Sequence, residues 1–330
     1  MFVDVAIIGA GPIGIFSVFQ AGMLGMTTCV IDALDVPGGQ CSALYPEKPI
    51  YDIPGYPEIM AQNLIDQLMQ QASPFKPIYM LSRTVTSIFH KGNIFKISTS
   101  NGDIIEAKAV IIAAGAGSFG PNKPPLKDIE IYENKSIFYS VFKRQDLANK
   151  KILIAGGGDS AVDWAISLSS IADVSIMHRR SKFTAAKNNV DKLHDLHNQE
   201  KIKIIIGYQL SELIGENGNL QQVVITDLTV SKKHVDVDIL LPFFGLKQDL
   251  GVLAEFGLNI KNNHLAVNAP YYETNISGIY AVGDVATYEG KLKLILTGFA
   301  ESSSALHHAY NRVFDGKALH FEYSTSKGVK

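Results

Sequence analysis

Two segments of the chain share one pattern of hydrophobic and polar positions. In each, a short apolar run (residues 3–8 and 151–155) ends in a glycine-rich turn, a helical stretch follows, and a second apolar run comes next (residues 27–31 and 174–177). Continuous apolar runs of this length are typical of strands buried on both faces of a parallel sheet. The pattern therefore predicts two strand–turn–helix–strand units, the arrangement in which dinucleotides are bound.

The first glycine-rich turn carries its glycines at Gly9, Gly11 and Gly14, and Asp32 follows the next apolar run. Glycines at these positions let the backbone approach a pyrophosphate at the N-terminus of the following helix. A carboxylate at the end of the second strand accepts hydrogen bonds from ribose hydroxyls and repels a 2′-phosphate. The first unit is therefore expected to bind FAD or NAD.

The second turn fills the same three positions with Gly156, Gly158 and Ala161, and its next strand ends in His178, Arg179 and Arg180. No acid stands there. Guanidinium groups bind phosphate through bidentate, charge-assisted hydrogen bonds, so this unit is expected to bind NADP(H). A duplicated scaffold without cofactors is the alternative, but it would leave the contrast between an acid and two arginines unexplained.

The order of the remaining patterns predicts one domain inserted into another. Short alternating runs (84–90, 94–100 and 104–108) predict an antiparallel meander, and an apolar strand is expected at 109–114. A proline-rich segment from 119 to 126 marks a domain crossing, and residues 242–245 mark the return. We expect an α/β protein of two Rossmann-like dinucleotide-binding domains, the outer domain at 1–118 and 245–330 and the inserted domain at 119–244.

Composition and charge narrow the classes of function. The chain has 330 residues, of which 46% are hydrophobic, so it can form two cores. Its net charge is −2, so it has no overall positive charge that would attract nucleic acid or an anionic membrane. Its apolar runs are too short to span a bilayer, and a cytoplasmic location is expected. Cys29 and Cys41 are the only cysteines, which is typical of a reducing compartment.

One histidine pair has the spacing of metal ligands. His194 and His197 would lie on one face of a helix, but the sequence offers no third ligand and the neighbouring residues are charged or polar. A solvated helix face explains the pair better, and no metal site is expected.

Several motifs together resemble one protein family. These are residues 9–14, Asp32, 38–40, 113–115, 156–161, 178–180 and 283–284, and their order and spacing resemble the two-domain flavoprotein disulfide reductases in their short, thioredoxin-reductase-like form. The resemblance implies FAD in the outer domain and NADPH in the inserted domain. Thioredoxin reductases carry a Cys-x-x-Cys before the second glycine turn, whereas residues 134–150 contain no cysteine. Dithiol chemistry is therefore excluded, since it has no sulfur to use.

The cysteine-free branch fits better. Residues 39–48 and the tail after the last predicted helix resemble thioredoxin-reductase-type ferredoxin–NADP reductases. The resemblance implies a homodimer whose FAD is stacked between Tyr45 and Tyr323. It also implies further contacts with FAD, the last of them from the partner subunit's tail, at the positions Gln40, Val85, Phe119, Asp284 and Thr325.

The expected chemistry belongs to the cofactors. NADPH gives a hydride to the flavin, and the reduced flavin passes single electrons to a carrier such as ferredoxin, so no acid–base residue is required. A helix starting near Thr297 and Gly298 would direct its positive end at the flavin's pyrimidine edge. Two alternatives remain open: an NADPH-dependent quinone or flavin reductase, and a redox-sensing module that binds FAD and NADPH without sustained turnover.

The tail generates a first prediction. If Tyr323 covers the flavin, it must move aside before hydride transfer, so the tail would gate productive NADPH binding. Truncation after Phe321 should change the flavin absorbance and the stopped-flow rate of flavin reduction, and should weaken FAD retention through loss of Thr325. A truncated protein with unaltered spectrum, FAD affinity and reduction rate would exclude the tail from the active site.

Overall fold

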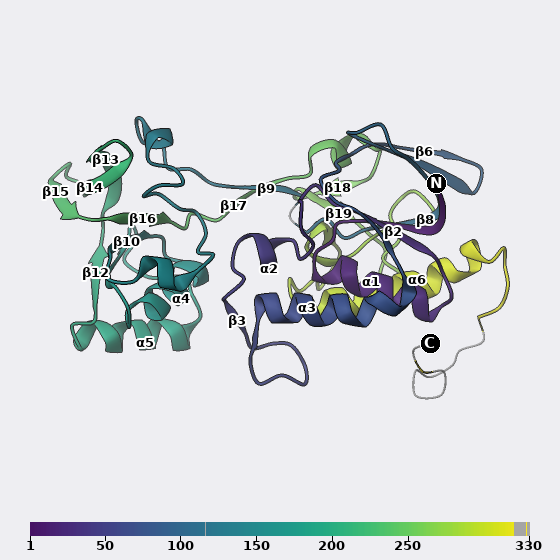
Figure 1. The fold of residues 1–330 in the computed structure, drawn as a ribbon, viewed down its shortest axis with the longest axis horizontal. Helices are drawn as coiled ribbons and strands as arrows, with labels where there is room; N and C mark the ends of the chain where they lie inside the picture. Colours follow the sequence, from purple (N-terminus) through teal and green to yellow (C-terminus); the bar gives the residue numbers. More distant parts are fainter. Residues whose placement is uncertain (116, 320–327, 329–330) are drawn as a thin grey trace. The chain divides into compact units, whose positions relative to one another are not determined.

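The chain forms two compact units in the computed structural model, which describes residues 1–115, 117–319 and 328, with the backbone alone at 118–120 and 246–248 (Figure 1). Unit 1 comprises Met1–Phe119 and Gln248–Lys330, and unit 2 comprises Gly120–Lys247. The expected junctions, after residues 118 and 244, lie close to these boundaries. Which nucleotide each unit binds stays a prediction.

A seven-stranded sheet forms the centre of unit 1, in the order β5-β2-β1-β8-β7-β6 with β20 also paired to β8. The strands are β1 (Phe2–Ile8), β2 (Thr28–Ile31), β5 (Ile78–Met80), β6 (Val85–Lys91), β7 (Ile94–Thr99), β8 (Ile104–Ile112) and β20 (Ile279–Ala281). The β6–β7–β8 pairs are antiparallel, as the meander predicts, and the others are parallel.

One expectation about this sheet is wrong. The runs 104–108 and 109–114 were expected as two strands, but they form the single strand β8, which ends at Ile112. Its first half pairs with β7 and its second half with β20, while β1 pairs along its other edge. The change from alternating to continuous apolar residues therefore marks a change of neighbours within one strand.

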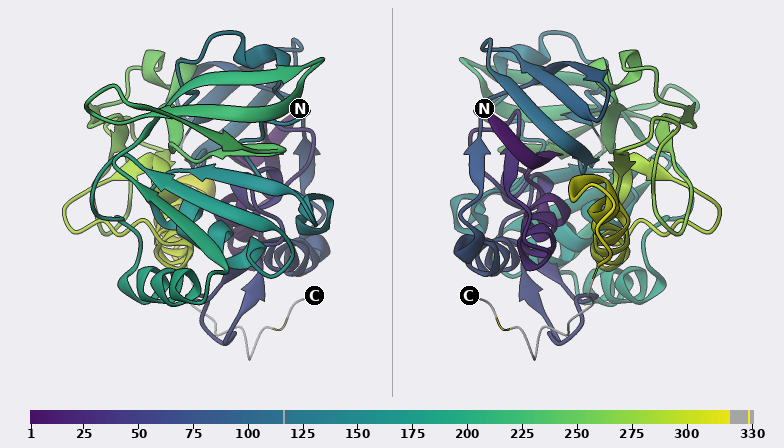
Figure 2. Two further views of the ribbon diagram at one scale, coloured as in Figure 1. Left: turned by 90° about the vertical axis from the view of Figure 1, so that its left-hand side faces the viewer. Right: turned by 90° about the vertical axis from the view of Figure 1, so that its right-hand side faces the viewer.

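The helices of unit 1 pack on this sheet around a shared apolar core. They are α1 (Pro12–Met23), α2 (Gln40–Ala43), α3 (Ala61–Ala72) and α6 (Ile295–Val313). Helices α1 and α6 lie side by side, with the Ser17 and Ser302 hydroxyls hydrogen-bonded at 2.7 Å in the interior (Figure 2). Short elements complete the unit: β3 (Pro49–Ile50), β4 (Ile59–Met60), β18 (Ile260–Lys261), β19 (His264–Ala266), β21 (Ala286–Thr287), η1 (Ser73–Phe75), η4 (Gly251–Glu255) and η5 (Gly283–Val285).

Unit 2 contains a parallel sheet in the order β12-β11-β10-β16 and an antiparallel sheet, β13-β14-β15. The strands of both sheets can be followed in Figure 2 (left view). Residues of the two sheets share one apolar core. The elements are β10 (Lys151–Ala155), α4 (Asp159–Leu168), β11 (Asp173–His178), α5 (Lys187–Asn198), β12 (Ile202–Ile206), β13 (Gln209–Glu216), β14 (Asn219–Thr226), β15 (Lys232–Asp236), β16 (Ile239–Pro242), η2 (Ile129–Ile131) and η3 (Arg144–Leu147).

The segments where the chain passes between the units, β9 (Ser118–Pro121) and β17 (Leu246–Asp249), pair with each other. Among the helices of the described residues, none is long and apolar enough to cross a membrane.

Candidate functional site: two glycine turns with different surroundings

The first glycine turn joins β1 to α1 by close backbone packing. A Cβ on Gly14 would lie 1.8 Å from the carbonyl oxygen of Gly9, and one on Gly9 would lie 2.4 Å from that of Ala113. Gly11 is different, because a Cβ there would meet nothing within 4 Å. Gly9 and Gly14 are therefore required by the fold, while Gly11 borders open space that a ligand can enter.

The open space at Gly11 lies at the start of α1. Gly11 is the N-cap of this helix and offers no side-chain cap, so the positive end of the helix is left to other partners. The following loop comes close: the Gly38 amide donates to the Ala10 carbonyl at 2.7 Å, and a Cβ on Gly39 would lie 3.1 Å from the Gly11 Cα. This arrangement fits the pyrophosphate of a dinucleotide.

Asp32 lies beside the same turn, directly after β2. Its carboxylate accepts hydrogen bonds from the Ala10 amide at 2.5 Å and the Leu34 amide at 2.8 Å. Burial raises the pKa of this carboxyl, and the two amide donors act in the opposite direction. The amides fix the carboxylate at the position expected for ribose binding, which stays a prediction.

The structure brings Tyr45 and Asp284 together from distant parts of the chain. Gln40 begins α2, and Tyr45 follows that helix and packs against the core of unit 1. Burial raises the pKa of the Tyr45 phenol, and the neighbouring Cys41 and Asp284 add to the shift. Asp284 lies in η5, directly after β20 and Val282. Tyr45 and Asp284 therefore lie near each other in unit 1. The resemblance implies that both contact FAD, which stays a prediction.

For the other residues expected to contact FAD, the structure says less about a role in binding. Val85 is 4% exposed at the start of β6 and packs in the core with Ile31 and Ile97. Phe119 belongs to β9, and the structure describes only the backbone of this residue. Tyr323 and Thr325 lie outside the described residues. Their roles toward FAD stay predictions.

The two cysteines are not placed as a redox pair. Cys29 lies within β2 and Cys41 within α2, and both are buried. Burial raises the pKa of each thiol to about 11, so both remain protonated near neutral pH. They have the character of small apolar core residues.

The second turn repeats the division of roles seen in the first. A Cβ on Gly156 would lie 2.7 Å from the Phe243 carbonyl oxygen and 2.9 Å from the Ala161 Cβ. On Gly158 it would meet only the Thr184 hydroxyl, at 4.0 Å. Gly158 is the N-cap of α4 and, like Gly11, has no side-chain cap. The turn again has one tightly packed glycine and one that borders accessible space.

His178, one of the residues expected to bind NADP, also packs against the turn, a contact that the sequence did not reveal. A Cβ on Gly157 would lie 2.3 Å from its imidazole ring, and Phe183 stacks on the ring with 5.6 Å between centroids. Burial, together with the charges of Arg180 and Arg179, lowers the pKa of this histidine. Its buried Nε2 has no hydrogen-bond partner in the described part of the chain. A buried ring nitrogen without a partner beside the turn fits a site completed by a ligand.

Arg179 and Arg180 follow at the surface. Both are exposed, and neither side chain forms a hydrogen bond or an ion pair with any residue that the structure describes. Two guanidinium groups at the end of β11 are thus available to an anionic ligand, as the sequence predicts for a 2′-phosphate.

The loop that carries these arginines is tied to the turn. The Thr184 amide and hydroxyl both donate to the Gly157 carbonyl, at 2.7 and 3.1 Å. The Ala186 amide donates to the Asp159 carboxylate at 2.8 Å. Sequence reasoning missed Thr184 and Asp159, although an acid in the first turn of a helix is itself a recognisable signal.

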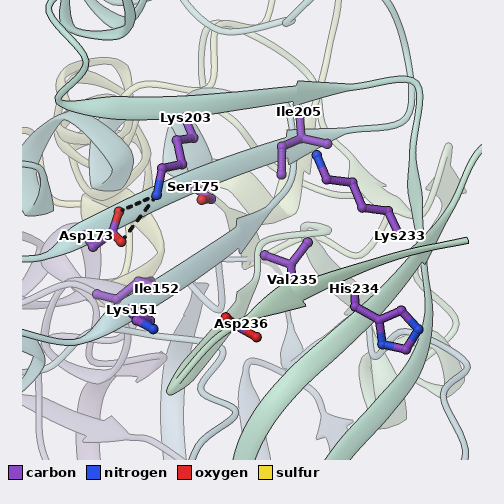
Figure 3. Close-up of a pocket in the computed structure, with 10 residues that line it drawn as sticks. All are labelled: Lys151, Ile152, Asp173, Ser175, Lys203, Ile205, Lys233, His234, Val235 and Asp236. Atoms are coloured by element: carbon purple, nitrogen blue, oxygen red, sulfur yellow. Dashed lines mark hydrogen bonds and ion pairs between the residues drawn. The ribbon is translucent and has the colours of Figure 1, made fainter.

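A pocket in unit 2 lies away from this turn (Figure 3). Residues of β15 and residues near the amino ends of β10, β11 and β12 line this pocket. Among the latter, Lys203 forms an ion pair with Asp173 at 3.2 Å, and Lys151 lines the pocket with them. The glycine turn follows the carboxyl end of β10, at the opposite edge of the sheet. This pocket is therefore distinct from the predicted NADP site.

The histidine pair of α5 has other contacts. His197 Nδ1 lies 2.9 Å from the Ile202 carbonyl oxygen, and His194 meets the ring of Phe183 edge-on. In the described ranges, no group of three or more histidine, cysteine or acidic side chains could hold a metal ion.

Comparisons with known proteins identify the family. The family model described as "Pyridine nucleotide-disulphide oxidoreductase" matches residues 3–309, and the chain belongs to this family. The resemblance to its thioredoxin-reductase-like members is confirmed by a solved structure, the Lactococcus lactis thioredoxin reductase, with a TM-score of 0.81, 28% identity, and coverage of 95% of this chain and 99% of that one. The T. acidophilum thioredoxin reductase has a TM-score of 0.82 at 23% identity, with coverage of 95% of this chain and 99% of that one, and it supports the fold. The expected α/β fold class is confirmed.

Nearer relatives carry a more particular name. A protein of Rickettsia rickettsii (strain Sheila Smith), named "Ferredoxin--NADP reductase", is 61% identical over 99% of this chain and 96% of its own length. A protein of the same name from Rickettsia bellii (strain OSU 85-389) is 58% identical over 98% of both chains. The chain is thus similar, along almost its whole length, to proteins that carry the name of the group that its motifs resemble.

The first turn generates a prediction that separates fold from binding. Gly14→Ala should lower the free energy of unfolding by roughly 3 kcal/mol or more, because its Cβ overlaps the Gly9 carbonyl. Gly11→Ala should change that free energy by less than about 1 kcal/mol, since Gly11 has a φ of −70° and free space around it. It should nevertheless raise the Kd for FAD at least about tenfold.

Urea unfolding, extrapolated to zero added FAD, and fluorescence titration with FAD measure the two effects separately. If Gly11→Ala binds FAD as tightly as the unmodified protein, the space beside Gly11 is not the pyrophosphate site.

Proposed function

We propose that the chain transfers electrons between NADPH and ferredoxin by way of bound FAD. The observation that carries this proposal is the difference between the two turns: an acid, Asp32, beside the first, and two unpaired arginines, Arg179 and Arg180, beside the second. The predicted activity, enzyme class and pair of cofactors agree with the relatives, which are named for this reaction at 58–61% identity. The chain is accordingly an oxidoreductase of the ferredoxin–NADP(+) reductase type.

Unit 1 has the residues to hold FAD. Backbone amides at the start of α1, next to Gly11, would bind the pyrophosphate, and Asp32 would accept hydrogen bonds from the adenosine ribose. Asp284 would hold the ribityl chain, with Gln40 and Tyr45 beside the flavin ring. When bound, FAD supplies the exchange between a two-electron hydride donor and a one-electron acceptor.

Helix α6 would complete the flavin site. Its N-cap, Leu294, offers no side-chain cap, so the amides of the first turn keep their positive partial charge. Directed at the pyrimidine edge, this charge stabilises negative charge on the reduced ring. The role requires neither an acid nor a base.

Unit 2 has the residues to hold NADPH. The start of α4 at Gly158 would bind the pyrophosphate, and Arg179 and Arg180 would bind the 2′-phosphate. The unpaired Nε2 of His178 lies next to the same turn and would gain a partner from the ligand. The ties from Thr184 to Gly157 hold the arginine-bearing loop in place for this contact.

The proposal extends to assembly and location. A homodimer would let Thr325 of one tail reach the flavin of the other subunit, and Tyr323 would stack on the ring opposite Tyr45. The absence of a membrane-spanning helix from the described residues is compatible with the proposed cytoplasmic location.

Steady-state oxidation of NADPH tests the function directly. The purified protein should reduce ferredoxin faster than thioredoxin or a quinone, each offered separately. A Cys29→Ser, Cys41→Ser variant should retain its FAD and at least half of this activity, because both thiols are buried and protonated.

The other outcomes of this experiment point to other functions. Turnover of quinone far above that of ferredoxin would indicate a small-molecule reductase, and slow oxidation with every acceptor would indicate a redox-sensing module. Loss of electron transfer in the cysteine variant, with FAD retained, would contradict a thiol-free mechanism.

The two arginines give a prediction about cofactor choice. Arg179→Ala, Arg180→Ala should raise the KM for NADPH and leave that for NADH nearly unchanged, each lost charge-assisted contact costing roughly 1.5–3 kcal/mol. Lys192→Ala, Lys201→Ala is the matched control, because it removes two exposed positive charges elsewhere in unit 2. If both variants keep the ratio of the KM for NADPH to the KM for NADH that the unmodified protein has, these arginines do not bind the 2′-phosphate.

A further inference from the structure

A buried carboxylate in α6 organises the segment around Asp284. Glu301 is 1% exposed and lies in the second turn of α6. Its Oε2 accepts a hydrogen bond from the Gly283 amide at 2.7 Å, and its Oε1 accepts one from the Tyr288 hydroxyl at 2.7 Å. The Lys291 ammonium group forms an ion pair with the same Oε1. One carboxylate thus binds three points of the segment 283–291.

The pair formed by Lys291 and Glu301 is itself buried. The side chains are 7% and 1% exposed, and the Lys291 ammonium also lies 5.5 Å from the centroid of the Tyr288 ring. Removing two charges from water costs free energy that their attraction often fails to recover, so a buried pair contributes little to stability compared with apolar residues of the same volume. Stability alone does not explain why the pair lies here.

The position of the pair relative to the predicted flavin contacts offers an explanation. The amide held by Glu301 belongs to Gly283, the residue immediately before Asp284. A Cβ on Gly298, in the first turn of α6, would lie 2.4 Å from Ile13 of α1 and 3.4 Å from the Gly283 Cα. The start of α1, the turn at Gly283 and the start of α6 therefore meet, and each is a predicted contact of FAD.

We propose that Glu301 and Lys291 are positioning residues for FAD, a role that rests on the proposed function and is additional to it. Glu301 fixes the backbone of Gly283 and thereby the Asp284 carboxylate that would hold the ribityl chain. Lys291 compensates the charge of Glu301 and holds the segment between Asp284 and α6 against that helix. Neither side chain needs to touch the flavin.

The decisive variant replaces both charges by apolar chains of similar length. Lys291→Met, Glu301→Met leaves no uncompensated buried charge, so the unit should stay folded. Its Gly283 amide has no acceptor, however, and the Kd for FAD should rise at least tenfold. In the full-length protein with saturating FAD, amide hydrogen exchange should accelerate in 283–294, while peptides from β1 and β8 keep their protection and report that unit 1 is intact.

The same loop provides a matched control. Glu289→Met, Lys293→Met makes the same two substitutions at exposed positions of the segment and should leave the Kd and the exchange rates within twofold of the unmodified protein. If the Lys291→Met, Glu301→Met variant also stays within twofold in both measurements, the positioning role is excluded.

A second variant covers the case in which the double substitution prevents folding. Glu301→Gln keeps the volume and one acceptor oxygen but removes the charge that holds Lys291, and its FAD affinity should still fall measurably, with altered visible circular dichroism of the bound flavin. Unaltered affinity and circular dichroism would overturn the inference. The proposed function fails by a different result, namely an unmodified protein that does not bind FAD at all.

Discussion

No side chain can be accommodated at Gly14, because a Cβ there would lie 1.8 Å from the carbonyl oxygen of Gly9. This contact sets the distance between β1 and α1 and so places the start of the helix directly after the strand. The neighbouring contact of Gly9 with Ala113 attaches the turn to the end of β8. The open space at Gly11, the position of Asp32 and the approach of the loop at Gly39 all depend on this packing.

Unit 2 has the same packing of glycines at its turn, but the side chains beside the turn differ in charge. Gly156 packs against the Phe243 carbonyl much as Gly9 packs against Ala113, and Gly158 borders free space as Gly11 does. The difference lies at the end of the second strand, where unit 1 has a carboxylate held by amides and unit 2 has the His178 imidazole followed by two exposed arginines. A shared scaffold can thus discriminate between nucleotides through the charge of a few side chains.

When no thiol takes part in electron transfer, the reaction depends on how the protein binds and orients its cofactors rather than on a reactive side chain. Neither cysteine is exposed, and burial keeps both thiols protonated near neutral pH. The buried carboxylate of Glu301 connects the turn before Asp284 to α6. In such a protein, residues that never touch the substrate can still determine how well the flavin is held and how its ring is oriented.

The sequence by itself determined the local features of the protein. These are the apolar runs that form strands, the glycines that permit close turns, and the absence of a cysteine pair before the second turn. They also include the contrast between Asp32 in the first unit and Arg179 and Arg180 in the second. These signals are local because strand and helix periods and turn geometry depend on neighbouring residues. Tertiary structure decided the rest. It joined two runs into β8 by giving the strand different neighbours along its length, and it placed the His178 ring against Gly157. Nothing adjacent in the sequence marks Glu301 as buried, since its partners Gly283 and Lys291 reach it only when the chain folds back on α6.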